Sequence, residues 1–114
     1  MTRVYKIVSR TEWKAAVAEG VFQGAGIDHK DGYIHLSTAA QASDTARLHF
    51  AGRDDLVLIE LETDGLGDAL KWEPSRGGAL FPHLYEPLRT DAALSVRSLS
   101  LNAAGWPDPG PLEP

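Results

Sequence analysis

The chain has 114 residues and a mass of 12.3 kDa, which fits a single domain, and it contains no cysteine, which excludes disulfides, thiolate catalysis and cysteine-ligated metal sites. Sixteen acidic residues against eleven basic ones give a formal charge of −5, and the basic residues are spread singly, so we expect no nucleic-acid partner. No apolar run is long enough to cross a bilayer and no export signal opens the chain, so we expect a cytoplasmic protein without a membrane partner.

The first elements predicted along the chain are a strand and a helix. Residues 3–8 alternate between polar and apolar side chains, which is typical of a strand. Ser9 and Glu12 have the spacing of a capping box, which predicts a helix that begins after Ser9. Gly20 is suited to end that helix, because glycine readily adopts the left-handed conformation found at helix C-termini.

A polar turn, a short strand and a second helix are predicted next. Two glycines bound the turn over residues 26–32, and the strand covers residues 33–37. Either Ser37 or Thr38 can serve as the N-cap of a helix over residues 39–50. Free amides and the dipole favour an anion at a helix N-terminus, so this position can offer a site to an anionic group of a ligand.

The second half of the chain predicts mostly strands. Residues 56–62 give the clearest one, because four apolar residues are followed by alternation. We expect a short strand over residues 70–73. A loop is predicted over residues 74–82, because this segment has a proline at each end. A last strand with a local irregularity is predicted over residues 94–101.

The order of these elements predicts one compact domain. The two helices come early and the strands mostly late, which favours an α+β fold over a repeat of strand–helix–strand units. We place the domain at residues 1–104. The proline-rich residues 105–114 are expected to form a flexible tail, because prolines oppose regular structure.

His35 is the first candidate for chemistry. On the predicted strand it shares a face with Tyr33 and Ser37, so one wall can offer an imidazole, hydroxyls and an anion site to a ligand such as a pyrophosphate. The alternative is a core histidine with a satisfied hydrogen bond, beside hydroxyls that only cap the helix. Spacing alone leaves both interpretations open.

A second candidate segment surrounds His83. The proline before His83 restricts the local backbone, so the imidazole is held in place, and Tyr85 shares its face if the segment is extended. Glu73 is the candidate acid, because Trp72 beside it can exclude water from the carboxylate. The alternative is a rigid hydrophobic loop that covers a sheet edge. We expect no metal site, since the four histidines are scattered.

These segments resemble a small bacterial family known as domain of unknown function 952 (DUF952). The resemblance covers residues 5–101. It rests on short motifs in the same order along the chain, namely Tyr5-Lys6-Ile7, Trp13, Gly20, Asp31 to Thr38, Gln41, Thr45, Phe50, Lys71-Trp72-Glu73 and Phe81 to Tyr85. The family looks like a compact relative of the ADP-ribosyltransferase fold, which implies a split, mostly antiparallel mixed sheet with NAD held in its cleft.

The resemblance also implies roles for the candidate residues. The motif around His35 is similar to a strand motif of the RNA phosphotransferases of that superfamily, in which the histidine belongs to the active site. We therefore expect a NAD-binding protein that cleaves the bond between nicotinamide and ribose, with NAD as its substrate. The catalytic candidates are His35, His83 and Glu73, and the candidates for binding the ligand are Ser37, Thr38, Gln41, Trp72 and Tyr85.

Two other functions stay open. One is a non-catalytic module that binds a nucleotide or another small ligand, which is favoured because the first motif, around Lys6, lacks the expected histidine or arginine. The other is a transferase or hydrolase that acts on a different small metabolite, with His35 and His83 as acid and base. The proposals depend on these two imidazoles opening onto one shared hollow.

Overall fold

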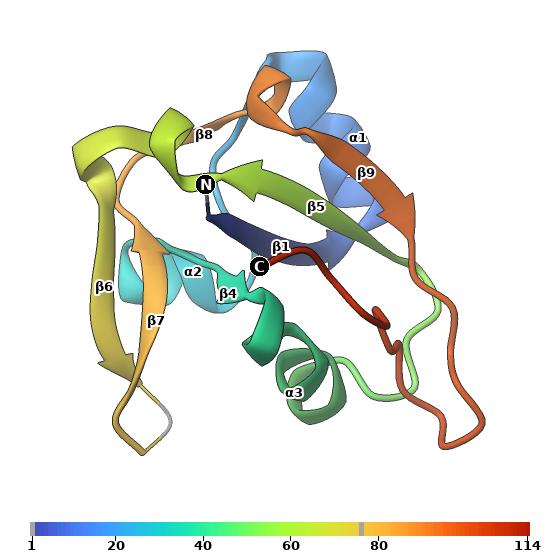
Figure 1. Cartoon of the computed structure of the whole chain (residues 1–114). Coiled ribbons are helices and arrows are strands. Elements are labelled where there is room, and N and C mark those ends of the chain that lie inside the picture. The colour runs from blue at the N-terminus through green and yellow to red at the C-terminus, as the bar shows by residue number, and fades with distance from the viewer. Residues whose placement is uncertain (1, 76) are drawn as a thin grey trace.

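A four-stranded antiparallel sheet forms the centre of the structure, a computed structural model that describes residues 2–75 and 77–114 (Figure 1). Its strands in spatial order are β4 (Ser37–Thr38), β1 (Arg3–Ser9), β5 (Leu56–Glu62) and β9 (Ser95–Ser98). The two central strands are the ones with the clearest alternation in the sequence, and both predictions are confirmed.

Two smaller sheets flank the central one. The three-stranded sheet consists of β3 (Ile34–His35), β7 (Ala79–Leu84) and β6 (Leu70–Ser75), and the two-stranded sheet consists of β2 (Val21–Phe22) and β8 (Leu88–Arg89). Every strand pairing that the structure describes is antiparallel. The prediction of a mixed sheet is therefore wrong, because no crossover in the described chain brings two parallel strands side by side.

The segment of residues 34–38 connects the two larger sheets, because β3 belongs to one of them and β4 to the other. In β3 His35 is the register partner of His83, and in β4 Ser37 is the register partner of Tyr5. Since β4 pairs with only two residues of β1, the strands separate beyond Tyr5. Beyond Tyr5, this edge of β1 faces the space between the two sheets, and the cavity described below lies in that space.

Three helices pack around the sheets, namely α1 (Arg10–Glu19), α2 (Ile27–Asp31) and α3 (Ala39–His49). The side chain of Ser9 accepts a hydrogen bond from the Glu12 amide, and Gly20 ends α1 with φ 86°, as predicted. The turn expected over residues 26–32 is a short helix instead, because the buried side chain of Asp28 bonds to the backbone on both sides of it. Among the described residues no helix is long and apolar enough to span a membrane.

The chain between β5 and β9 departs from the predicted loops. A 3₁₀ helix, η1 (Thr63–Ala69), precedes β6, and a second one, η2 (Thr90–Ala92), follows β8. The loop expected over residues 74–82 is wrong, since both of its prolines lie in the β6–β7 hairpin. Pro82 takes part in the sheet through its carbonyl oxygen, which accepts a hydrogen bond from the Leu36 amide at 3.0 Å. Pro82 has no backbone N–H to donate, but this does not prevent it from lying in a strand.

The central sheet has a hydrophobic cluster on each face. One cluster joins alternate residues of β1 and β5 to α1 and β2, and its members include Val4, Val8, Ile59, Leu61, Trp13 and Phe22. The other joins the remaining residues of these strands to α3, and its members include Tyr5, Ile7, Leu56, Leu58, Ala46 and Leu99. The Cα radius of gyration, 13.1 Å, is that of one compact domain, and the predicted α+β class is confirmed.

Residues 105–114 pack against the second cluster instead of extending from the domain as a detached tail. Figure 1 shows this segment running back along the central sheet, so that the C-terminus lies near β1. Trp106 and Leu112 contact the cluster, Pro107 is fully buried, and the Tyr5 hydroxyl donates to a tail carbonyl at 2.6 Å. Prolines oppose regular structure but not packing, and these apolar side chains hold the segment in place.

Candidate active site

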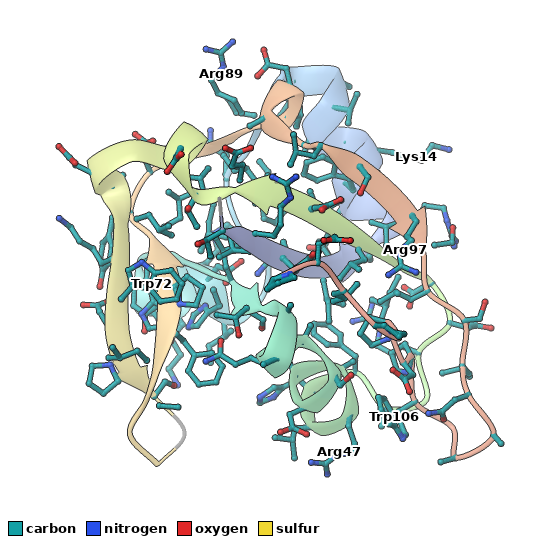
Figure 2. All side chains as sticks on the ribbon, in the orientation of Figure 1. Lys14, Arg47, Trp72, Arg89, Arg97 and Trp106 are labelled. Carbon is teal, nitrogen blue, oxygen red and sulfur yellow. The ribbon has the colours of Figure 1, made fainter. Side chains whose placement is uncertain are left out.

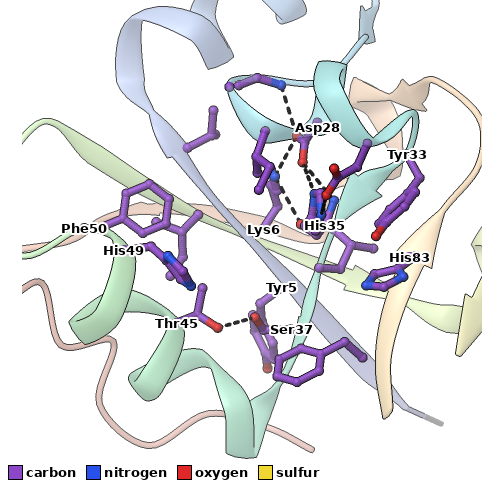
Figure 3. Close-up of a pocket in the computed structure, with 18 of the residues that line it drawn as sticks. Tyr5, Lys6, Asp28, Tyr33, His35, Ser37, Thr45, His49, Phe50 and His83 are labelled. Atoms are coloured by element: carbon purple, nitrogen blue, oxygen red, sulfur yellow. Dashed lines mark hydrogen bonds and ion pairs between the residues drawn. The ribbon is translucent and has the colours of Figure 1, made fainter. Parts of the chain in front are cut away.

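A cavity of about 480 Å³ opens where the two larger sheets separate (Figure 3). Its walls come from the free edge of β1, from α2, from β3 and β4, from the end of α3 and from β7. Small-molecule sites typically have about 300–1,000 Å³, so the volume suits a compact metabolite. Both candidate histidines, His35 and His83, line it.

The two histidines lie side by side because they are register partners on neighbouring strands. The ring centroids of His35 and His83 are 5.4 Å apart, and the ring planes form an angle of 66°. Side chains of directly opposed residues point to the same face of a sheet. The structure thus places both imidazoles at one cavity, as the hypothesis of a shared hollow requires, and their catalytic roles stay a prediction.

Tyr33 lies against both histidines. Its ring stacks on His83 with a centroid distance of 4.2 Å, and the centroids of His35 and Tyr85 are 4.6 Å and 5.0 Å away. These four side chains form what we call the aromatic wall. Tyr33, His35 and His83 line the cavity and Tyr85 does not, so a flat ring that enters the cavity can stack on the part of the wall formed by Tyr33 and the histidines.

Both ring nitrogens of His35 contact carboxylates. Nδ1 lies 2.6 Å from Asp28 Oδ1, and Nε2 lies 2.9 Å from Asp31 Oδ2. A carboxylate only accepts hydrogen bonds, and a neutral imidazole has only one N–H. Both contacts are therefore hydrogen bonds only when His35 is protonated on both nitrogens, as an imidazolium.

Asp28 is the centre of this network (Figure 3). Its buried carboxylate accepts hydrogen bonds from Lys6 Nζ at 2.8 Å and from the amides of Ala25 and His35, each at 3.0 Å. Burial alone raises the pKa of Asp28, but the hydrogen bond from His35 and the Lys6 ammonium outweigh it and hold the pKa well below its ordinary value. Burial also lowers the pKa of Lys6, against the opposing effect of Asp28.

Glu73 anchors the other side of the aromatic wall. Its Oε1 accepts hydrogen bonds from His83 Nδ1 and from the Tyr85 hydroxyl, both at 2.8 Å. These bonds lower the pKa of Glu73, and the bond to Glu73 raises the pKa of Tyr85 to about 12. When the His83 ring donates its proton from Nδ1 to this carboxylate, a neutral ring keeps a lone pair on Nε2. A base oriented by an acid is a recurring catalytic arrangement.

The other predicted ligand-binding residues are bonded within the protein or lie outside the cavity. Thr38 and Gln41 form the capping box of α3, with hydrogen bonds of 3.2 Å and 3.0 Å, and neither lines the cavity. Ser37 does line it, but its hydroxyl bonds to the Thr45 hydroxyl at 2.8 Å. Trp72 is 42% exposed on β6 (Figure 2), and strand alternation places it on the opposite face of the hairpin from Glu73.

Sequence reasoning missed Lys6 and Asp28 as members of the site. A signal for Lys6 was present, because it alternates with Val4 and Val8 and so faces the same buried cluster. A lysine in that position needs an acidic partner. Asp28 gave no such signal, since a carboxylate in a polar segment bounded by glycines has the pattern of a solvated turn.

The chain is similar to a protein family and to solved structures of one protein. The family model described as "Protein of unknown function (DUF952)" matches residues 7–96. The crystal structure of protein CC0527 from Caulobacter crescentus is 50% identical, covers 96% of each chain and superposes with a TM-score of 0.93. The solution NMR structure of CC0527 is 51% identical over 94% of this chain and 92% of that chain, with a TM-score of 0.85. No curated protein matches the sequence.

Proposed function

The chain belongs to the DUF952 family, and from the site that it holds we propose that its cavity binds a nicotinamide–ribose ligand and promotes cleavage of the bond between the two. NAD is the first ligand to test, because the resemblance to ADP-ribosyltransferases implies it. The observation that carries the proposal is the arrangement of Tyr33, His35 and His83 around one cavity of about 480 Å³.

The parts of such a ligand have counterparts in the cavity. The nicotinamide ring is a flat cation, which the face of Tyr33 can receive by stacking. The ribose hydroxyls are hydrogen-bond donors, and Asp31 offers them a partly exposed carboxylate. Positive charge develops on the ribose as the bond breaks, so carboxylates near it stabilise that state.

In the proposed reaction a water molecule attacks the ribose carbon that holds nicotinamide. The electron pair of the broken C–N bond stays on the ring nitrogen, and nicotinamide leaves as a neutral molecule. His83 Nε2 accepts the proton that the water loses. Glu73 holds His83 through Nδ1, and the lowered pKa of Glu73 keeps its carboxylate ionised for this role.

Calorimetric titration with NAD, followed by measurement of released nicotinamide, tests the proposal. We expect heat of binding at millimolar NAD or below, and we expect His83→Ala to reduce nicotinamide release by about 100-fold or more. His29→Ala is the matched control, because His29 is an exposed histidine of α2. Absence of binding by the folded protein removes NAD as the ligand, and equal effects of the two variants move the chemistry away from His83.

A binding module without chemistry is the second candidate. It is favoured by the burial of His83, whose side chain is only 4% exposed and lies under Tyr33. In that case NAD binds, the affinity depends on the aromatic wall, and the bound NAD survives hours of incubation unhydrolysed. Release of nicotinamide at a rate above that of free NAD excludes this candidate.

A further inference from the structure

A capping box occupies the N-terminus of α3, where an anionic ligand was expected. The Thr38 side chain accepts a hydrogen bond from the Gln41 amide, and the Gln41 side chain accepts one from the Thr38 amide. The amide nitrogen of the Gln41 side chain donates to a β7 carbonyl at 2.8 Å. The side chains of Thr38 and Gln41, which were expected to bind a phosphate-bearing ligand, are thus hydrogen-bonded within the protein. Neither residue lines the cavity.

The two permanent cations among the described lining residues are also paired with carboxylates of the protein. Lys6 contacts Asp28 at 2.8 Å, and Arg53 contacts both carboxylate oxygens of Asp55, at 3.1 Å and 2.8 Å. His35 lies between two carboxylates. A phosphate would have to compete with a carboxylate for each of these groups.

Carboxylates outnumber the permanent cations among the described residues that line the cavity. Glu12, Asp28 and Asp31 stand against Lys6 and Arg53, an excess of one negative charge. Three histidines, His35, His49 and His83, also line the cavity, and a charge on one of them brings this set to neutrality. Glu73 adds a further carboxylate behind His83. The described lining therefore has no excess of positive charge to balance the two phosphates of NAD.

Three carboxylates also lie near Tyr33 in the aromatic wall. The pKa of Tyr33 is raised, first by burial and then by Asp31, Glu73 and Asp28. A ring that stacks on Tyr33 is therefore stabilised when it is positively charged. Pyridinium rings, in which the ring nitrogen is bonded to ribose, have this charge.

We infer that the cavity takes its ligand as a phosphate-free pyridinium riboside, with the cationic ring on Tyr33 and the ribose hydroxyls donating to carboxylates such as Asp31. The inference rests on the proposed function, because it chooses among ligands that share the nicotinamide–ribose unit. It replaces the expected recognition of a pyrophosphate with recognition of a cation and of hydroxyl donors.

A series of three probes tests this choice by calorimetry: nicotinamide riboside, nicotinamide mononucleotide and NAD. We expect nicotinamide riboside to bind at least about tenfold more tightly than NAD, and we expect added NaCl to weaken its binding, because salt screens the attraction. Binding of NAD or the mononucleotide as tight as that of the riboside overturns this inference and leaves the proposed function standing. If none of the three binds, both fail.

Charge variants locate the preference in the cavity. Asp31→Asn removes a lining carboxylate, and we expect it to weaken binding of nicotinamide riboside about fivefold and to reduce the preference over NAD. Asp44→Asn is the matched control, since Asp44 is exposed on α3 and pairs with Arg47. If Asp44→Asn reduces the preference as much as Asp31→Asn, the net charge of the protein causes it and the inference is overturned.

Discussion

His35 and His83 face the same cavity, but their ring nitrogens have different partners. His35 contacts a carboxylate through each nitrogen, whereas His83 contacts Glu73 through Nδ1. A general base needs an unprotonated nitrogen directed at the proton it accepts. In the proposed function His83 meets this requirement, and His35 contacts Asp28 and Asp31 and so holds these two carboxylates in place.

The Lys6–Asp28 pair gives a prediction for stability. Asp28→Asn leaves the Lys6 ammonium buried without a carboxylate, and we expect the free energy of unfolding to fall by about 3–5 kcal/mol in urea denaturation at pH 7. Replacing the pair together, as Lys6→Met with Asp28→Asn, should recover much of this loss, because no buried charge is then unpaired and the amide oxygen at position 28 can still accept from a backbone N–H. A loss below about 1 kcal/mol in the single variant contradicts this account.

The same pair sets the response of the wild-type protein to acid. The pKa of Asp28 lies below the ordinary value of 3.8, so the ionised carboxylate stabilises the folded state above that pH. As the pH falls below about 4, the unfolded chain binds a proton that the folded chain excludes, and this stabilisation is lost. Asp28→Asn should show a flatter decrease of the urea midpoint over the same pH range.

The capping box of α3 gives a prediction at the scale of one element. Thr38→Ala removes the side-chain oxygen that accepts from the Gln41 amide, and we expect the free energy of unfolding to fall by about 1 kcal/mol. Thr38→Ser keeps the hydroxyl and should lose less. Because Thr38 lies outside the cavity lining, neither variant should change ligand affinity, and a tenfold loss in Thr38→Ala alone would return Thr38 to the binding site.

Local patterns predicted the elements that depend on local interactions. The alternation of β1 and β5 and the cap of α1 depend on residues that are close together in the sequence, and these predictions are confirmed. The short helix α2 and the β6–β7 hairpin depend on distant partners. Asp28 bonds to the amide of His35, and Pro82 bonds to Leu36 across two strands. Single-sequence reasoning about glycine and proline could not supply these contacts.

The candidate site was predictable to a similar extent. Strand alternation identified the shared face of Tyr33 and His35, and the structure brings their rings to 4.6 Å. The buried partners of Lys6 and His35 come from α2, whose position the sequence did not predict. Residue type alone also could not distinguish a hydroxyl that caps a helix from one that faces a ligand, as Thr38 illustrates.

The tail gives a prediction for the whole molecule. Removing residues 105–114 uncovers the cluster around Tyr5 and eliminates the buried Pro107 together with the contacts of Trp106 and Leu112. We expect the free energy of unfolding to fall by about 2 kcal/mol or more, measured by urea denaturation. The point variant Trp106→Ala should show part of this loss. An unchanged urea midpoint after truncation would mean that the tail does not stabilise the domain.

Because Lys6 and Asp28 are buried together, each restricts the evolution of the other. Replacing Asp28 singly leaves the buried Lys6 ammonium without its carboxylate partner, so a lineage that loses the aspartate first passes through a destabilised ancestor. Positions 6 and 28 should therefore covary among homologues, appearing as the charged pair or as two apolar residues and seldom as a mixture of the two.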